Sequence, residues 1–344
     1  MKILHLIFTM KTGGAESMLV DIANEQLRMG HEVAILIINR GSEPKLLAQF
    51  DPAITIIELN RKLSSRNPMP IIRGNLAVKR LNPDVIHVHN ERGVNFLLPS
   101  LRKRVIQTVH TTGIQLCGCQ TQTAIVAISK AVANDLKLRC NVTADVIMNG
   151  IDTSAIDVKE NSANLKKLIC VGRLDMSVKG QDLLLTALTK FPEMTLTLVG
   201  DGSEMDAARR LAVELGIDSR VEFLGKMNRG GIYKILNNYD AFVMPSRQEG
   251  FGLVLAEAMA AGLPVITSAL PGPLEVIDGG RLGYAFEPDS VDSLVEAIKR
   301  LSDNWTYAQQ LARIEGRKFV ADHFSVSTTA ANYVALYEKL RLRA

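Results

Sequence analysis

Short apolar runs alternate with helix-length amphipathic segments along almost the whole chain, and this alternation limits the fold more than any other feature. The first runs cover residues 2–8 and 32–38, and the last covers 283–286. Strands that are apolar on both faces and separated by helices are typical of parallel sheets covered by helices on each side. The sequence therefore predicts an α/β protein with strands over residues 2–8, 32–38, 54–59, 85–88, 105–109, 124–128, 168–171, 196–199, 221–224, 241–244, 264–267 and 283–286.

The alternation is interrupted once, after Asn149-Gly150-Ile151-Asp152, where a polar stretch to Asn164 shows no periodicity. At 344 residues the chain also exceeds the length that one hydrophobic core usually serves. We therefore expect a first domain over residues 1–150, a linker over 151–165, a second domain over 166–325 and a final helix over 326–344.

Composition excludes several classes of protein. Only 5% of the residues are aromatic and one is Trp, which argues against a lectin-like binder built on stacking platforms. No apolar stretch reaches the roughly 18 residues of a membrane span, and the first residues are typical of a strand rather than a signal peptide. The four cysteines are too scattered for a disulfide framework, and Cys117-Gly118-Cys119 lacks the second pair of a zinc site. These features predict a reduced, cytoplasmic protein.

Charge is distributed unevenly. Residues 1–152 carry 18 Lys/Arg against 12 Asp/Glu, whereas the remainder carries 22 against 24. Two interpretations stay open: solvated loops and helix ends, or a surface that makes peripheral contact with an anionic membrane. Nucleic acid is not expected as a partner, because no aromatic residues are interleaved with the basic runs.

Gly13 and Gly14 stand between a predicted strand and the helix that follows them. Glycines there let a ligand approach the backbone, and the helix N-terminus presents N–H groups and a positive dipole to an anion. The pattern favours a diphosphate, but an unliganded tight turn explains it equally well.

A second candidate for diphosphate binding follows the first strand of the second half. It consists of Gly172, Arg173 and Lys179. Two cations at that edge of the sheet suit a diphosphate, and two surface charges are the alternative.

The segment from Pro245 to Val265 carries the strongest signal. A strand ends, a loop bracketed by glycines holds Glu249, and the following helix holds Glu257 among Leu, Ala and Met residues. A glutamate in a first helical turn merely suits the dipole, whereas one placed deeper needs a partner, which paired ribose hydroxyls could supply.

These motifs together resemble family 4 of the retaining glycosyltransferases. The resemblance rests on that segment and on Gly13-Gly14-Ala15-Glu16, Gly30-His31-Glu32-Val33, Asn149-Gly150-Ile151-Asp152 and Gly172-Arg173-Leu174, which follow in order over nearly the whole chain. It implies the GT-B architecture, in which two Rossmann-like domains face each other across a cleft. The first domain would bind the acceptor and the second the nucleotide, and the last helix would cross back to the first domain.

The resemblance also implies roles for particular residues. Glu257 would hold the ribose hydroxyls, Arg173 and Lys179 the diphosphate, and Glu249 the donor sugar. His110 matches a family histidine beside the transferred sugar, although a strand-end residue bonded to local backbone is the alternative. The catalytic candidates are His110, Arg173, Lys179 and Glu249, and the donor-binding candidates are Gly13, Gly14, Gly172, Lys226, Met227, Gly250, Phe251, Gly252, Leu253 and Glu257.

The implied reaction moves a hexose or N-acetylhexosamine from a nucleotide sugar, UDP-sugar before GDP-sugar, to a glycan or lipid-linked acceptor. It would proceed with retention, in polysaccharide or lipopolysaccharide synthesis. No two aspartates stand two residues apart, so we expect no metal and no cofactor, with cations stabilising the leaving diphosphate. The stretch between His110 and Ala124 is short for the family, which implies an open acceptor site. The alternatives are a nucleotide-sugar 2-epimerase and a non-enzymatic, degenerate transferase scaffold.

Overall fold

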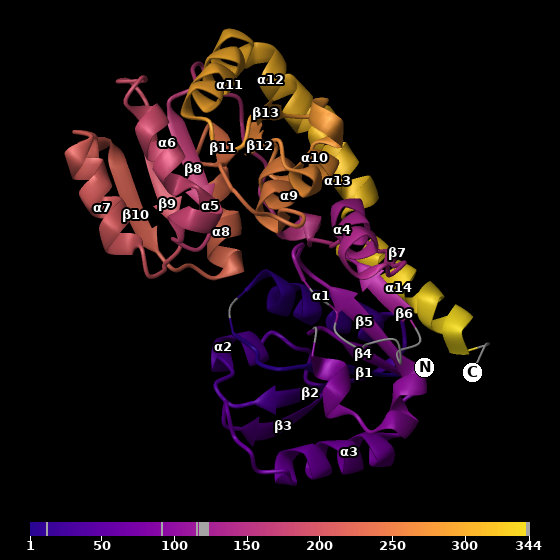
Figure 1. Cartoon of the computed structure of the whole chain (residues 1–344). Helices are drawn as coiled ribbons and strands as arrows, with labels where there is room; N and C mark the ends of the chain where they lie inside the picture. The colour runs from indigo at the N-terminus through magenta and orange to yellow at the C-terminus, as the bar shows by residue number, and fades with distance from the viewer. Residues whose placement is uncertain (12, 91, 115, 117–123, 342–344) are drawn as a thin grey trace. The chain divides into compact units, whose positions relative to one another are not determined.

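The computed structural model describes residues 1–11, 13–90, 92–114, 116 and 124–341, and it divides into two compact units (Figure 1). Unit 1 comprises Met1–Ile151 and Ser325–Ala344, and unit 2 comprises Asp152–Phe324. Each unit has its own parallel sheet and its own hydrophobic core.

Unit 1 contains a seven-stranded parallel sheet in the order β3-β2-β1-β4-β5-β6-β7. Its strands are β1 (Lys2–Ile7), β2 (Glu32–Asn39), β3 (Thr55–Arg61), β4 (Val85–Val88), β5 (Val105–Val109), β6 (Ala124–Ala127) and β7 (Asp145–Val146). Its helices are α1 (Gly14–Arg28), α2 (Pro44–Leu47), α3 (Met69–Leu81), η1 (Gly93–Phe96), η2 (Pro99–Arg104), α4 (Lys130–Cys140) and α14 (Val326–Arg341). The sequence missed β7, because two exposed residues give no periodicity.

Unit 2 contains a six-stranded sheet in the order β10-β9-β8-β11-β12-β13, in which every recorded pairing is parallel. Its strands are β8 (Lys167–Val171), β9 (Thr195–Val199), β10 (Val221–Gly225), β11 (Ala241–Met244), β12 (Val265–Ser268) and β13 (Tyr284–Phe286). Its helices are η3 (Thr153–Ala155), α5 (Met176–Lys179), α6 (Gln181–Leu188), α7 (Met205–Glu214), η4 (Asp218–Arg220), α8 (Arg229–Leu236), α9 (Leu253–Ala260), α10 (Pro271–Val276), η5 (Asp278–Gly280), α11 (Val291–Asp303), α12 (Trp305–Leu311), the π-helical η6 (Ala312–Gly316) and α13 (Arg317–His323).

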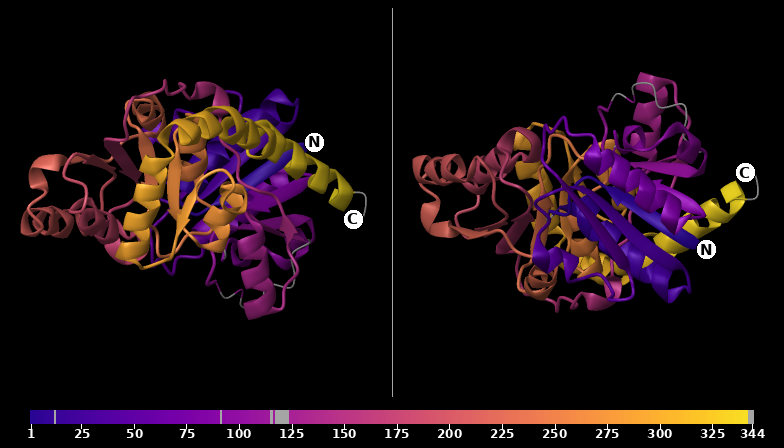
Figure 2. Two further views of the ribbon diagram at one scale, coloured as in Figure 1. Left: turned by 90° about the horizontal axis from the view of Figure 1, so that it is seen from above. Right: turned by 90° about the horizontal axis from the view of Figure 1, so that it is seen from below.

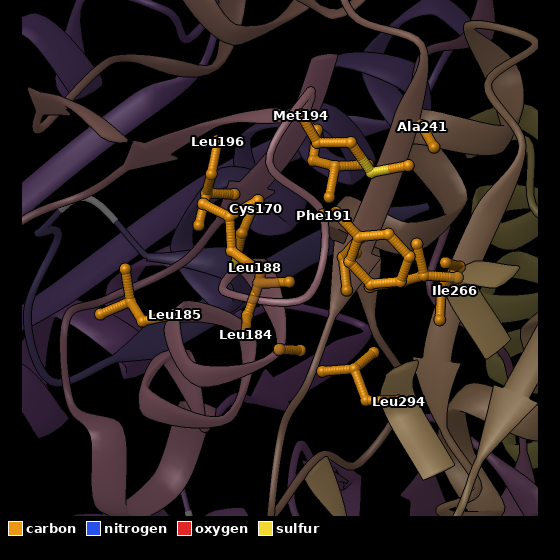
Figure 3. Packing of buried hydrophobic residues seen from close by; sticks show 14 of the residues in the cluster. Cys170, Leu184, Leu185, Leu188, Phe191, Met194, Leu196, Ala241, Ile266 and Leu294 are labelled. Carbon is orange, nitrogen blue, oxygen red and sulfur yellow. The ribbon is translucent and has the colours of Figure 1, made fainter. Parts of the chain in front are cut away.

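One core cluster of unit 2 lies where helices α6 and α11 cover strands of the sheet. Leucines of α6 and Leu294 of α11 converge on side chains of β8, β9, β11 and β12, as Figure 3 shows. Cys170 belongs to this cluster, and burial raises the pKa of its thiol to about 12. It is therefore an inert core residue.

Helix α14 packs on α1 in unit 1, so the C-terminal segment lies beside the N-terminal strand (Figure 2). Tyr333 and Tyr337 are fully buried there against Met18 and Ile22 of α1. Gly150 allows the chain to pass close by, because a Cβ at this position would lie 2.7 Å from the carbonyl oxygen of Ser325.

Residues 151–165, for which the sequence predicts a linker, are mostly fixed to unit 2. Lys159 Nζ lies 3.3 Å from Asp240 Oδ1, and Ser162 Oγ donates to the same carboxylate at 2.8 Å. The indole N–H of Trp305 donates to the carbonyl oxygen of Ser162 at 2.9 Å. A polar stretch without periodicity is here held by side-chain hydrogen bonds, which a hydrophobic pattern cannot show.

Candidate functional site

The strand order of unit 2 reverses between β8 and β11, and the loops after these two strands emerge side by side at the C-terminal edge of the sheet. In open α/β sheets such a switch point is where ligands bind. Arg173 and Lys179 follow β8, and Glu249 follows β11. The topology therefore brings the two strongest sequence motifs of unit 2 to one place.

Glycines make the close approach of these loops possible. A Cβ at Gly180, whose φ is +65°, would lie 2.0 Å from the carbonyl oxygen of Pro245. A Cβ at Gly200 would lie equally close to the carbonyl oxygen of Gly172, at 2.0 Å. No other residue type fits at these contacts without backbone movement.

Lys179 and Glu249 contact each other directly. Lys179 Nζ donates to Glu249 Oε2 at 2.7 Å, and both side chains are about three-quarters buried or more, at 26% and 19% exposed. The backbone supports this pairing, because Arg247 N donates to the carbonyl oxygen of Val178 at 2.8 Å. The structure thus joins two of the predicted catalytic residues across 70 positions of sequence.

Arg173 lies nearer the solvent. Its side chain is 65% exposed, and Nη2 lies 3.2 Å from Asp175 Oδ2. Helix α5 carries the chain from Met176 to Lys179, and the left-handed Gly180 ends it. Asp175, which no sequence motif pointed to, would compete with a diphosphate for this guanidinium group.

The loop after Glu249 presents backbone rather than side chains. Phe251 is 1% exposed and packs edge-to-face on Phe324, with ring centroids 5.2 Å apart. Gly250 lies close to Gly272, because a Cβ at Gly272 would lie 2.4 Å from the carbonyl oxygen of Gly250. Gly252 has a φ of +104° and starts α9 at Leu253. Donor contacts at 250–253 stay a prediction that only main-chain groups or Leu253 could fulfil.

Glu257 differs from the expectation. It is buried in α9, as predicted, but it has protein partners. Arg229 Nε donates to Glu257 Oε1 at 2.7 Å, and the hydroxyl of Tyr233 donates to the same oxygen at 3.2 Å. The carboxylate therefore has protein partners, and its contact with the ribose hydroxyls stays a prediction. Arg229 and Tyr233 stand one helical turn apart on α8, so they present a joint face to Glu257. That spacing is the sequence signal that was missed.

Lys226 and Met227 link β10 to α8 at the same edge of the sheet, where Lys226 is exposed and Met227 half-buried. Their role in donor binding stays a prediction.

In unit 1, Gly13 and Gly14 lie at the start of α1, as expected. The N-terminus of this helix already has a carboxylate close to it, because a Cβ at Gly13 would lie 2.5 Å from Glu16 Oε2. Burial raises the pKa of Glu16, and the charge of Glu43 raises it further, whereas the hydrogen bond from its own backbone N–H lowers it. The diphosphate contact of Gly14 stays a prediction, with Glu16 as a neighbour that would compete for the same N–H groups.

Four histidines gather in unit 1: His5 lies in β1, His87 in β4, and His89 and His110 directly after β4 and β5. His5 pairs with His87 in the register of β1 and β4, and His89 and His110 follow, with their rings stacked at 5.9 Å. Gln26 donates to Tyr337 and so presents its oxygen to His5 Nε2 at 2.8 Å.

That contact assigns the tautomers. His5 carries its proton on Nε2 and accepts at Nδ1 from His89 Nε2 at 3.0 Å. Burial lowers the pKa of His5 to about 4, and burial together with the neighbouring imidazoles lowers the pKa of His87 and His89 well below the ordinary value. The cluster is therefore a network of neutral rings.

Among the described residues, His5, His87 and His89 also form one group whose nitrogens lie within 4.8 Å of one another, a spacing that could hold a metal ion. The nitrogens of His87 are however engaged by Thr108 and Tyr337, each at 2.7 Å, and those of His5 by His89 and Gln26. A metal would have to displace these bonds, so the arrangement fits a neutral hydrogen-bond network better.

His110 ends β5 at the C-terminal edge of the unit 1 sheet. Burial lowers its pKa to about 4, and its Nε2 is buried with no hydrogen-bond partner among the described residues. An unsatisfied buried nitrogen fits a residue that meets a ligand. Two further expectations, the open acceptor region after His110 and the Cys117–Cys119 pair, fall largely or wholly on residues outside those described.

The two parallel, Rossmann-like sheets match the GT-B fold of glycosyltransferases. Residues 152–317 match the family model described as glycosyl transferases group 1, and residues 12–155 match that described as glycosyltransferase family 4. The two models together span most of the chain, and the protein belongs to this glycosyltransferase family.

Relatives agree with this assignment at low identity. An uncharacterised glycosyltransferase of Methanocaldococcus jannaschii is 28% identical over 299 residues, which cover 74% of this chain and 75% of that protein. The lipopolysaccharide core biosynthesis glycosyltransferase LpsE of Rhizobium meliloti is 26% identical over 348 residues, with 98% of both chains covered.

Solved structures show the same fold. HepE of Anabaena, in complex with UDP and glucose, has a TM-score of 0.82 at 23% identity, with 98% of this chain and 99% of that chain covered. A glycosyltransferase of Rickettsia africae has a TM-score of 0.81 at 18% identity and 98% coverage of both chains. Among the residues that the structure describes, no helix is both long and apolar enough to cross a membrane.

Proposed function

We propose that this enzyme transfers a hexose or N-acetylhexosamine from a UDP-sugar to a glycan or lipid-linked acceptor, with retention of anomeric configuration. The transfer would contribute to the synthesis of a cell-surface polysaccharide or lipopolysaccharide at the cytoplasmic face of a membrane. The relatedness to LpsE supports the acceptor class, and the UDP and glucose of the HepE complex support the donor.

The contact between Lys179 and Glu249 at the switch point carries the proposal. A cation and a carboxylate that a ligand can separate provide one group for a diphosphate and one for sugar hydroxyls. Arg173 adds a second, more exposed cation on the same loop.

The proposed chemistry follows from these charges. The bond between the anomeric carbon and the diphosphate oxygen breaks while the acceptor oxygen bonds to that carbon. The acceptor proton passes to the leaving diphosphate oxygen on the same face, which retains the configuration. Lys179 and Arg173 stabilise the negative charge that grows on the diphosphate, and preorganised charges of this kind are often the largest catalytic term.

Ligand-dependent melting tests the donor. At 100 times its dissociation constant a bound nucleotide adds about 2.7 kcal/mol to the free energy of unfolding. We expect UDP and UDP-sugars to raise the melting temperature more than GDP, CMP or dTDP.

Product analysis tests the reaction. Incubation of UDP-sugars without acceptor should give no epimer, and epimer formation would instead indicate the 2-epimerase. An NMR spectrum of the glycoside product reports its anomeric configuration.

Glu257→Gln is expected to weaken UDP binding by about 1–3 kcal/mol and to destabilise unit 2. The carboxylate balances Arg229, and both side chains are largely buried, at 5% and 17% exposed. Breaking a buried pair by removing one charge typically costs about 3–5 kcal/mol, and the retained amide oxygen should keep this variant at the lower end.

Calorimetry of UDP binding and urea unfolding measure the two effects separately. Glu296→Gln on α11, an exposed residue, is the control. Unchanged UDP affinity in a destabilised Glu257→Gln would leave the residue a purely structural ion pair.

Activity is expected to survive chelation by EDTA, since the proposed mechanism neutralises the leaving group with Lys179 and Arg173. Initial rates with and without EDTA, followed by readdition of Mg²⁺ or Mn²⁺, measure this directly. A complete loss that metal reverses would show that the two cations do not suffice.

A further inference from the structure

Helix α3 of unit 1 has one face against the sheet and a second face that none of the described residues of unit 1 covers. The inner face consists of Gly74, Asn75 and Val78, which are buried. The outer face, on the opposite side by helical periodicity, consists of Met69, Ile72, Arg73, Leu76, Lys79 and Arg80, all of them exposed. Figure 1 shows α3 along the β2–β3 side of the unit 1 sheet.

The inner face fixes α3 firmly. A Cβ at Gly74 would lie 2.6 Å from the ring of Phe96, so the helix sits as close as glycine permits. Asn75 Nδ2 donates to the carbonyl oxygen of Phe96 at 2.9 Å, and its oxygen accepts from Leu98 N at 2.8 Å. The exposure of the outer face is therefore a property of the docked helix.

The apolar residues of the outer face form a stripe. Met69, Ile72 and Leu76 follow one another at three- and four-residue spacing and are 54%, 49% and 50% exposed. Leu63, in the loop before α3, is 69% exposed. Single exposed apolar residues are ordinary, whereas a stripe indicates an interaction surface.

The charges around this stripe have one sign. Residues 59–83 contain Lys and Arg but no Asp or Glu. The flanking acidic residues are directed elsewhere. Leu59 faces the core on the α3 side of the sheet, so the preceding Glu58 faces the opposite side, because successive side chains of a strand alternate. Asp84 accepts a hydrogen bond from Lys2 N at 2.8 Å. The outer face is thus apolar and purely basic.

We propose that the outer face of α3, with Leu63, docks on an anionic lipid bilayer. An amphipathic helix with apolar residues flanked by Lys and Arg lies in the plane of a membrane interface, and anionic headgroups complement its charge. A second copy of the chain fits less well, because a two-fold dimer would place this basic surface against itself.

The topology gives this surface a use. The loop at 62–68 joins the C-terminal end of β3 to α3, so it lies at the same edge of the unit 1 sheet as Gly14 and His110. Docking there would hold that edge near the bilayer, within reach of a lipid-linked acceptor. This last point rests on the proposed function; the membrane contact itself does not.

Co-sedimentation of the full chain with vesicles tests the contact without any donor. We expect binding to vesicles that contain roughly one third phosphatidylglycerol in phosphatidylcholine, weak binding to pure phosphatidylcholine, and release at high salt. Arg73→Glu with Arg80→Glu should weaken the binding at least about tenfold, because each basic residue near the surface contributes about a factor of five.

The matched control is Arg210→Glu with Lys299→Glu, two exposed residues of unit 2 that change the net charge equally. Met69→Ser with Ile72→Ser and Leu76→Ser should also weaken binding, with Val213→Ser, 63% exposed on α7, as the apolar control. Circular dichroism checks that each variant is folded. Absence of binding to anionic vesicles, equal binding by the α3 variants and their controls, or a dimer that the α3 variants dissociate would each overturn the proposal.

Discussion

Lys179→Ala is expected to lower turnover by about 10²–10³-fold while the dissociation constant of UDP changes much less. The ammonium group meets a charge that grows only as the glycosidic bond to the diphosphate breaks, so it stabilises the transition state more than the bound donor. Lys179→Met should do similar harm, and Lys179→Arg should be milder. Arg173→Ala should act in the same direction but more weakly, because Arg173 is 65% exposed and pairs with Asp175.

The contact with Glu249 offers a sharper form of this test. If Lys179 served only to neutralise Glu249, the double variant Lys179→Met with Glu249→Gln would recover the activity that the single lysine variant loses. If Lys179 acts on the diphosphate, the double variant stays as slow or slower. Steady-state rates for the four proteins of this cycle decide the matter, and Lys299→Ala, at an exposed site of α11, is the surface control. Recovery in the double variant would overturn the catalytic role of Lys179.

Acidification from pH 6.5 to pH 5 is expected to destabilise unit 1 while unit 2 is affected far less. An unfolded histidine binds a proton near pH 6.5, whereas burial lowers the pKa of His5 and of His110 to about 4 in the folded chain. Between these values the unfolded state binds more protons. The free energy of unfolding therefore falls as the pH drops through 6.5 and continues to fall until about pH 4. Each histidine contributes up to about 1.4 kcal/mol per pH unit.

Hydrogen exchange followed by mass spectrometry measures this within one molecule. Peptides from β1, β4 and β5 should lose protection, after correction for the intrinsic exchange rate, and peptides from β8 and β11 should not. Unit 2 is an internal control because its one histidine, His323, is exposed. The range above pH 5 also lies above the titration of ordinary carboxylates. Equal loss in both units, or none in unit 1, would contradict the neutral histidine network.

The sequence by itself determined the strands and therefore the class of fold. Runs such as 85–88 and 105–109 are apolar on both faces, and only burial between helix layers satisfies such strands. Of the strands in the described residues, only the two-residue β7 escaped prediction. Gly252, in the predicted loop bracketed by glycines, also marked a real turn, because its φ of +104° leaves little other choice of residue.

Tertiary structure alone decided which residues are partners. Lys179 meets Glu249 because β8 and β11 are neighbours in the sheet, although 70 residues separate the two side chains. Glu257 of α9 meets Arg229 and Tyr233 of α8 only in the folded chain, which no local pattern on α9 could show. The period of two places His87 and His89 on one face of β4, but the register of β1 on β4 is what brings His5 to them. Helix, strand and turn preferences depend on residues that are close in sequence. Strand order and register depend on packing between distant segments, and these two determine which residues meet in the site.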